Sequence, residues 1–468
     1  MVCVLGFRAR AILYDDSVGV HATRPAARAI RQRIMVLFYA CSAFALLVAP
    51  PRPLRASTPR MEASATAATD APRRIRFLYS DTGGGHRASA LALQDALEAA
   101  HPGRIECDIV DLFVESGRLP FCEYPQIYKK LAETPWQWKL LFDFGDWDFG
   151  ILFNEWLTEL ICYREFRRLL AETPRPDLVI SVHPLLQAVP LKALAELDGG
   201  TRTTPFCTVV TDLGSASRQW FDNRVDKCYV PSDALGRIAT GRGLASNQIV
   251  QFGLPIRRGF WKGSGSGGNA EHNENDGAQQ QRRLRTSLGL APDRSTVLVV
   301  GGGDGMGGLS STAVAIGDAL GGVDAETQLV VVCGRNEQAA AELAKRPWPT
   351  NVGATILGFV DNMEEYMGAA SLLVTKAGPG TIAEATTMGL PCVLSSFLPG
   401  QEEGNVAFVE SSGFGAYRSD NVALAELVVA YLKDDAQLRR LSDAARRASR
   451  PEATMAIAKD LAKLVGVE

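Results

Sequence analysis

Residues 75–87 read IRFLYSDTGGGHR, and this short stretch decides the fold. Ile75–Ser80 is an apolar run of strand length, and three adjacent glycines separate it from the helical pattern of Ala88–Ala100. A strand, a glycine loop and a helix in this order are typical of a parallel α/β sheet whose loop binds a ligand where the helix begins. The sequence therefore predicts a Rossmann-like unit in the first half of the chain.

The same order returns in the second half. Thr296–Val300 (TVLVV) is a second buried strand, and the loop Gly301–Gly308 (GGGDGMGG) follows it. Further strand candidates occur at Ile105–Asp111, Leu178–Val182, Cys207–Thr211, Leu329–Val332, Leu372–Thr375 and Cys392–Ser395. Strands that alternate with helices predict parallel sheets, so we expect two doubly wound α/β domains with a cleft between them.

Length and composition set the predicted domain boundaries. A chain of 468 residues is too long for one hydrophobic core. Lys262–Arg283 is rich in Gly and Ser and then in Asn, Glu and Gln, which predicts a flexible insert. We therefore expect an N-terminal domain at 73–258, a flexible linker at 259–285 and a C-terminal domain at 286–468.

The net charge and the cysteine spacing argue against a nucleic-acid-binding protein and against a zinc site. The net charge of −3 argues against a general nucleic-acid binder, which would carry a basic excess. The nine cysteines have no CxxC or Cys/His ligand spacing, so no zinc site is expected.

Residues 1–72 differ in composition from the rest of the chain. They are rich in Arg, Ala and Ser and poor in acidic residues, as organelle-targeting extensions are. Within them, Ile34–Pro50 is an apolar run shorter than the roughly 20 residues of a comfortable bilayer span. A signal core followed by a transit-like segment predicts a two-step plastid import signal. A true N-terminal anchor is the alternative.

The first glycine loop presents a histidine. His86 follows Gly83–Gly85, and an imidazole at this point can take a proton from an attacking hydroxyl near neutral pH. A tight turn would explain the glycines alone, and a lone histidine is often structural. The position of His86 on the turn favours the catalytic interpretation.

The second glycine loop allows another class of enzyme. Gly303, Gly305 and Gly308 satisfy G-x-G-x-x-G, the dinucleotide-binding pattern, which would suit a nicotinamide oxidoreductase. Such an enzyme normally has one loop of this kind near the start of the chain, whereas here one opens each half.

Two later loops carry the remaining polar groups. In Thr375–Glu384 (TKAGPGTIAE), Thr381 and Glu384 could form a capping box, or the helix N-terminus could hold a diphosphate and Glu384 a ribose. In Pro399–Asn405 (PGQEEGN), the amide of Gln401 and the carboxylate of Glu402 could bracket sugar hydroxyls, or the loop could simply be solvated.

A stretch between the first strands is unusually aromatic. Trp136–Trp156 has helical periodicity, which favours either a core helix or a membrane-contacting surface, with Lys129, Lys130 and Lys139 nearby. The triplet Asp146-Trp147-Asp148 matches a D-x-D metal motif, but a helical, aromatic setting argues against a metal site.

Taken in order, the motifs resemble the monogalactosyldiacylglycerol synthase family, which is related to a bacterial N-acetylglucosaminyltransferase of peptidoglycan-precursor synthesis. The resemblance runs from about Ile75 nearly to the C-terminus. Its motifs are SDTGGGHRASA, ISVHPLLQAVPL, VVTDL, FGLPIR, GGGDGMGG, CGRN, NMEEYMGA, TKAGPGTIAEA and PGQEEGNV.

The resemblance implies a GT-B fold, with the acceptor lipid on the N-terminal half and UDP-galactose on the C-terminal half. It implies an inverting galactosyltransferase that uses the free hydroxyl of 1,2-diacylglycerol, requires no cofactor or metal, and has His86 as the base. The residues implied to bind the UDP-sugar are Arg257, Gly302, Gly303, Gly380, Thr381, Ile382, Ala383, Glu384, Gln401 and Glu402.

The same resemblance implies lipid contacts at Pro120 and Trp220. It also implies a peripheral position on a plastid envelope or thylakoid membrane, with activation by anionic lipids and a homodimer as candidate features. Family members carry histidines in the segment that is Gly214–Gln219 here, and often Lys where Leu357 stands. These departures affect substrate preference more than reaction class. A transferase for another sugar or lipid, and a catalytically silent binding protein, are the rival hypotheses.

Overall fold

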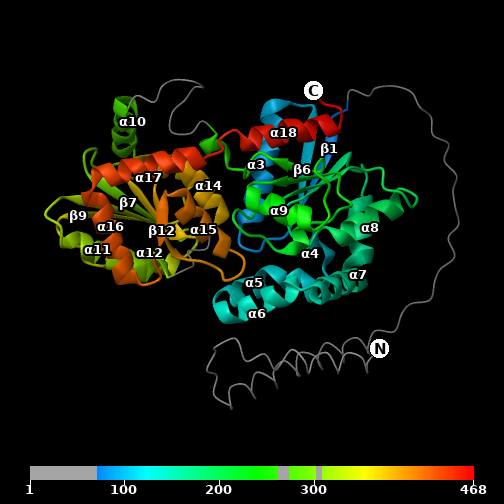
Figure 1. Cartoon of the computed structure of the whole chain (residues 1–468), viewed down its shortest axis with the longest axis horizontal. Helices are drawn as coiled ribbons and strands as arrows, with labels where there is room; N and C mark the ends of the chain where they lie inside the picture. The colour runs from blue at the N-terminus through cyan, green and yellow to red at the C-terminus, as the bar shows by residue number, and fades with distance from the viewer. Residues whose placement is uncertain (1–70, 262–273, 302–307) are drawn as a thin grey trace, which may run out of the picture. The chain divides into compact units, whose positions relative to one another are not determined.

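The computed structural model describes residues 71–261, 274–301 and 308–468 (Figure 1). Residues 1–70 of the targeting extension predicted at 1–72 lie outside the described residues, and so do residues 262–273 of the flexible linker predicted at 259–285. Asp70–Glu468 forms one compact unit. In the part of the chain that the structure describes, no helix combines the length and apolarity needed to cross a membrane.

The first half contains a six-stranded parallel sheet in the order β2-β1-β3-β4-β5-β6. Its strands are β1 (Arg73–Tyr79), β2 (Ile105–Asp111), β3 (Leu178–Ser181), β4 (Phe206–Val209), β5 (Lys227–Val230) and β6 (Ile249–Gln251). The helical elements are α3 (Gly85–Ala100), α4 (Leu112–Ser116), η2 (Phe121–Glu123), α5 (Tyr124–Ala132), α6 (Pro135–Asp146), α7 (Asp148–Ala171), α8 (Ala188–Leu197), η3 (Arg218–Trp220), α9 (Asp233–Gly241) and η4 (Arg258–Phe260).

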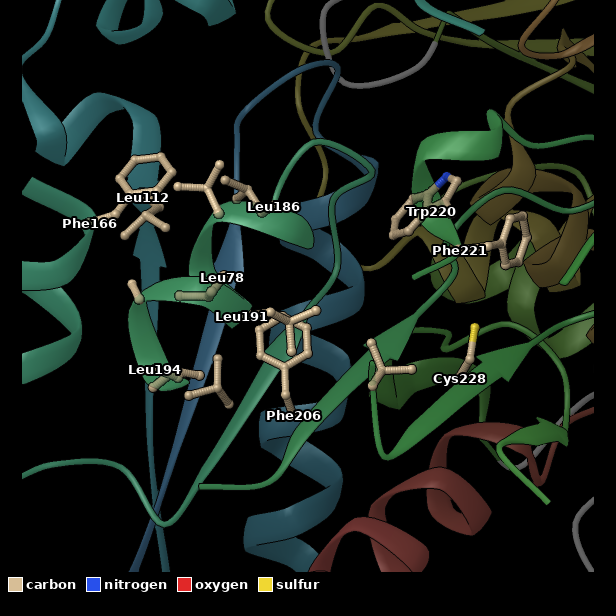
Figure 2. Close-up of a cluster of buried hydrophobic side chains, with 14 of the residues drawn as sticks. Leu78, Leu112, Phe166, Leu186, Leu191, Leu194, Phe206, Trp220, Phe221 and Cys228 are labelled. Atoms are coloured by element: carbon tan, nitrogen blue, oxygen red, sulfur yellow. The ribbon is translucent and has the colours of Figure 1, made fainter. Parts of the chain in front are cut away.

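Both faces of this sheet are covered, which explains why its central strands β3 (LVIS) and β4 (FCTV) are buried along their whole length. Neighbouring residues on a strand point to opposite faces: Phe77 packs into one buried cluster and Leu78 into the other. Figure 2 shows the cluster that contains Leu78, with Phe166 of α7 and Leu194 of α8 packed over the strands. Trp220 of η3 belongs to the same cluster, and the active-site candidates lie beside it.

The second half repeats this plan with the strand order β12-β11-β10-β7-β8-β9, again all parallel. Its strands are β7 (Ser295–Val300), β8 (Thr327–Val332), β9 (Val352–Leu357), β10 (Leu372–Lys376), β11 (Cys392–Ser396) and β12 (Gly415–Tyr417). Its helices are α10 (Glu274–Ser287), α11 (Leu309–Gly321), α12 (Glu337–Lys345), α13 (Met363–Ala369), α14 (Pro379–Thr387), α15 (Glu403–Ser412), α16 (Asn421–Lys433) and α17 (Asp435–Ala448). The predicted pair of doubly wound sheets is confirmed.

The last helix returns to the first half. Helix α18 (Ala453–Leu464) packs against α3 (Figure 1), and Ile457 and Leu461 lie in the same buried cluster as Phe77. Lys227 and Tyr229 of β5 both bond Asp460 of this helix. The range 286–468, expected from the sequence as one domain, therefore contributes its final helix to the other sheet.

The linker predicted at 259–285 is corrected by the structure at both ends. Phe260 is fully buried, and α10 forms a regular helix from Glu274 onward. Arg285 of that helix is buried, and its guanidinium donates to the Ala369 carbonyl (2.9 Å) and the Ser371 hydroxyl (3.0 Å). Polar composition predicted flexibility here because it could not reveal that one arginine finds buried acceptors.

Candidate active site

His86 lies at the start of α3, immediately after the glycine loop. The loop turns there because Gly83 and Gly84 adopt φ values of 93° and 75°, a conformation that disfavours side chains. The turn carries His86 into the interior, where 6% of it is exposed, and its Nδ1 lies 2.8 Å from the Thr211 hydroxyl. Burial lowers the pKa of His86 to about 4, opposed by a hydrogen bond with the Val182 backbone. The imidazole is therefore neutral near pH 7.

Two other aromatic rings surround His86. The His183 ring lies 4.8 Å from it, edge to face, and the Trp220 ring lies 5.8 Å from it. His183 accepts from the Leu185 amide at Nδ1, and its Nε2 lies 3.1 Å from the Thr82 hydroxyl. Burial and the neighbouring His86 hold the pKa of His183 well below its usual range, so both imidazoles are neutral.

Asp212 follows Thr211 shortly after strand β4, and no role was assigned to it from the sequence. It is 4% exposed, and its Oδ2 accepts from the Trp220 indole N–H at 2.7 Å. Burial raises the pKa of Asp212 to about 7, although hydrogen bonds from Trp220 and from the Gln401 side chain pull it down. One feature of the sequence could have identified Asp212: a lone carboxylate at the end of a buried strand, in the motif VVTDL.

The second half contributes the start of α14. Gly378 is its N-cap, Pro379 opens the helix, and no side chain caps it. The capping box considered for Thr381 and Glu384 is therefore absent, and the first N–H groups have no partner within the helix. Space is open where a Cβ of Gly380 would lie. The side chain of Ile382 is fully buried in the core, so only its backbone could serve a ligand.

Glu384, one turn further on, is paired. Its carboxylate accepts hydrogen bonds from both Nε and Nη2 of Arg257, each at 2.7 Å, in a bidentate ion pair. The resemblance implies that both residues bind the UDP-sugar, and in the structure they are paired with each other. Ala383 is half-buried and packs against the hydrophobic cluster of the second half.

The predicted sugar-binding pair Gln401 and Glu402 lies at the start of α15. The Glu402 carboxylate is buried, accepts from the Leu398 amide at 2.8 Å and pairs with Lys376 at the end of β10. Lys376 was not assigned from the sequence, although it stands in the TKAGPGT motif. Among the described residues, the amide oxygen of Gln401 is buried without a hydrogen-bond partner.

The segment after Asp212 docks into the second half. Leu213 belongs to a buried cluster of that half, and Ser215 donates to the Gln401 carbonyl at 2.8 Å. The backbones of Gly214 and Gly404 meet so closely that a Cβ on Gly214 would lie 1.9 Å from the Gly404 carbonyl oxygen. Asn405 completes the contact by accepting from the Gly214 amide and donating to the Ala377 carbonyl, each at 2.8 Å.

The remaining predicted site residues are Trp220, Pro120, Gly302 and Gly303. Trp220 is fully buried, so it presents no surface to a membrane, contrary to its predicted role as a lipid contact. Pro120 is exposed between α4 and η2. Gly302 and Gly303 lie outside the described residues.

The D-x-D triplet has other partners. Asp146 accepts from the Ser217 hydroxyl and the Arg218 amide, and Asp148 pairs with Arg218 and Arg242. Within the described residues, no cluster of three or more His, Cys, Asp or Glu side chains is arranged to hold a metal ion.

The aromatic stretch is a surface and not a core. Helix α6 has no buried residue at all, and α7 buries only one side of its length. We call the exposed apolar face of these helices the α6–α7 strip; it consists of Trp136, Leu140, Leu141, Trp147, Phe149, Leu152, Trp156 and Leu160.

Two six-stranded parallel sheets in one compact unit, with polar residues of both halves in contact, define the GT-B fold. Solved structures of this fold include Acinetobacter baumannii MurG (TM-score 0.52, 16% identity, covering 84% of this chain and 100% of that one). They also include the calicheamicin glycosyltransferase CalG4 (TM-score 0.51, 14% identity, 84% and 98%).

The sequence comparisons give the family. Residues 86–256 match the model of monogalactosyldiacylglycerol synthase, and residues 296–465 match the glycosyltransferase family 28 C-terminal domain. The chain is 37% identical over 403 residues to the chloroplastic monogalactosyldiacylglycerol synthase of Spinacia oleracea, covering 85% of this chain and 73% of that one. Against synthase 1 of Arabidopsis thaliana the identity is 35%, with 85% and 72% covered. The chain belongs to the monogalactosyldiacylglycerol synthase family.

These findings confirm the predicted family, the GT-B fold and a hexosyltransferase activity. They also confirm a plastid protein, since the curated relatives are named as chloroplastic.

Proposed function

We propose that the chain transfers galactose from UDP-galactose to the free hydroxyl of 1,2-diacylglycerol, with inversion at the anomeric carbon. The observation that carries this proposal is the meeting of the two halves around one short segment. Thr211 contacts His86 on the acceptor side, and Gly214 and Ser215, a few residues further on, bond Asn405 and the Gln401 carbonyl on the donor side.

In this mechanism His86 is the general base. Thr211 and the Val182 backbone hold its ring, and its neutral state leaves a lone pair for the proton of the acceptor hydroxyl. The hydroxyl oxygen forms a bond to the anomeric carbon as the bond from that carbon to the phosphate oxygen breaks. The electron pair leaves with UDP, and the proton passes to His86.

The second half supplies the donor site. The unpaired N–H groups at Gly380 and Thr381 face the diphosphate, because the start of a helix favours negative charge. Lys376 and Arg257 bring positive charge close to the same loop. Glu384 reaches the ribose by exchanging one of its two bonds with Arg257 for a hydroxyl. Gln401 offers its unpartnered amide oxygen to the sugar. Leaving-group charge is met in this way without a metal or cofactor.

The acceptor is a lipid, and the α6–α7 strip gives the enzyme a surface for reaching it. Its indole and phenyl groups suit the boundary between headgroups and acyl chains. Lys130 in the last turn of α5, and Lys139 of α6, whose ammonium pairs with Asp143, are the basic residues that in this proposal favour an anionic membrane surface. Attachment is peripheral in this proposal. Activation by anionic lipids and a homodimer stay predictions, to be tested by vesicle composition series and by light scattering.

An assay with radiolabelled UDP-galactose, diacylglycerol in mixed micelles and lipid extraction tests the proposal. We expect label in a galactolipid whose anomeric proton coupling shows the β linkage. His86→Ala should lower kcat by about 10²–10⁴-fold, the usual contribution of a positioned base, while UDP affinity stays unchanged. Full turnover in His86→Ala would show that His86 is not the general base.

Donor and acceptor competition separates the rival transferase. If another UDP-sugar or another lipid is used more than tenfold faster, the reaction class stands and the substrates change. UDP-sugar binding without any transfer would favour the silent binding protein instead.

A further inference from the structure

Asp212 has three features that the reaction scheme above does not use. It is buried, it bonds an aromatic residue beside the base, and it bonds a residue of the donor loop. Buried carboxylates usually have a cation as partner, because burial disfavours the charge. This one has two neutral neighbours that lower its pKa: Trp220, whose ring lies beside His86, and Gln401 of the donor loop.

Each partner connects Asp212 to one side of the site. On the acceptor side, Trp220 carries the connection: its N–H bonds Asp212 Oδ2 at 2.7 Å, and its ring lies 5.8 Å from the His86 ring. On the donor side, the Gln401 side chain is a hydrogen-bonding neighbour that lowers the pKa of Asp212, and Ser215, three residues after Asp212, donates to the Gln401 carbonyl at 2.8 Å. The side-chain amide oxygen of Gln401 is left unpartnered among the described residues, and so is available to a sugar hydroxyl.

We propose that Asp212 is a positioning residue for galactosyl transfer, which aligns Gln401 of the donor half and Trp220 beside His86 through one carboxyl group. This inference rests on the proposed function and adds a residue to it. Asp212 acts through its two partners and does not touch substrate. An ionised carboxylate accepts from both donors at once, whereas a protonated one turns one oxygen into a donor that competes with them.

The alignment therefore depends on pH. Burial raises the pKa of Asp212 to about 7, and the buried carboxylate of Glu402 acts in the same direction. Glu402 is itself paired with Lys376, and His86 and His183 are neutral across this range. Transfer should thus increase as pH rises through 7, when the carboxylate forms and holds both partners.

The test compares Asp212→Asn with a matched control in the full chain. Asn has one acceptor oxygen in place of two, so one partner is lost. We expect kcat to fall by about 10- to 100-fold, as for a reacting group displaced by about 1 Å, with UDP affinity unchanged and the inflection near pH 7 abolished. The control is Asp198→Asn, which removes a buried carboxylate that pairs with Arg175 and accepts from the Thr203 and Thr204 amides. It should lower Tm and leave the inflection in place.

Trp220→Phe gives a second, independent result. It keeps a ring beside His86 but removes the N–H that lowers the pKa of Asp212, so the inflection should move to higher pH. If Asp212→Asn fails to fold, Trp220→Phe still tests the positioning role of Asp212. An unmoved inflection in Trp220→Phe, or wild-type kcat and pH profile in Asp212→Asn, would overturn the positioning role.

A readout without substrate separates this inference from the proposed function. The indole N–H resonance of Trp220 should titrate near pH 7 in the wild type and not in Asp212→Asn. A wild-type protein that transfers no galactose would contradict the proposed function alone. A Trp220 indole resonance that does not titrate in the wild type would contradict the role of Asp212.

Discussion

At the scale of single residues, the site depends on uncharged histidines in a buried setting. His86 would be a poor base if it were protonated at neutral pH, and burial prevents that by lowering its pKa to about 4. The same burial has a cost in stability. In the unfolded chain a histidine takes up a proton near pH 6.5, so the unfolded state binds more protons than the folded state between pH 6.5 and 4.

Stability is therefore expected to fall as pH drops from 6.5 to 4, by up to on the order of 3 kcal/mol for His86. His183 contributes in the same direction. Urea unfolding at a series of pH values measures this, with His86→Asn as the comparison. The variant should show a shallower decline, because asparagine takes up no proton. Equal slopes in the two proteins would mean that His86 is not buried as a neutral group.

Sequence patterns located some of these residues but not their partners. The glycine turn placed His86 correctly at the start of a helix, because three glycines between a strand and a helix leave few alternatives. The pairing of Arg257 with Glu384 joins positions 127 residues apart, and no local pattern encodes it. Asp212 was missed for a similar reason: its burial depends on Trp220 folding over it, and on a loop of the other half.

At the scale of elements, the α6–α7 strip is the feature least like an ordinary soluble helix pair. Helical periodicity in Trp136–Trp156 was compatible with core and with surface, because aromatic residues serve both. The structure decides for the surface, since α6 buries nothing. Contact with the donor loop explains its placement: a Cβ on Gly400 would lie 2.5 Å from the Phe142 ring of α6.

A double substitution, Leu152→Ser with Trp156→Ser, tests the strip. Each large apolar side chain that enters a membrane contributes on the order of 1.5–3 kcal/mol, so the loss of two of them should lower vesicle affinity by about 100-fold or more. Sedimentation with liposomes measures this. The control is Val422→Ser on α16, which is 63% exposed against 65% for Leu152 but lies in the other half. Equal vesicle binding by the wild type, the double variant and Val422→Ser would show that the α6–α7 strip does not contact the membrane.

At the scale of the whole molecule, two halves with separate sheets are joined by more than the chain between them. Helix α18 returns to the first sheet, the Arg257–Glu384 pair bridges the halves, and residues 213–215 dock against Gly404 and Asn405. The repeated strand–loop–helix pattern predicted both sheets. It could not predict these joints, because each one depends on how two finished domains meet.

Gly214→Ala tests whether the docked segment 213–215 holds the site together. A Cβ there would lie 1.9 Å from the Gly404 carbonyl oxygen and 2.8 Å from the Asn405 amide nitrogen, so the two backbones must separate. We expect overpacking to cost about 1–3 kcal/mol at this contact, and galactosyl transfer to fall by roughly tenfold or more. UDP affinity should change little, because the N–H groups of Gly380 and Thr381 belong to the second half alone. Hydrogen exchange at the Gly404 and Asn405 amides should become faster. Gly241→Ala is the matched control, since a Cβ there meets nothing within 4 Å and that glycine has an ordinary backbone. Wild-type transfer and unchanged exchange in Gly214→Ala would mean that the halves can work without this contact, and that His86 and Gln401 are aligned by substrate instead.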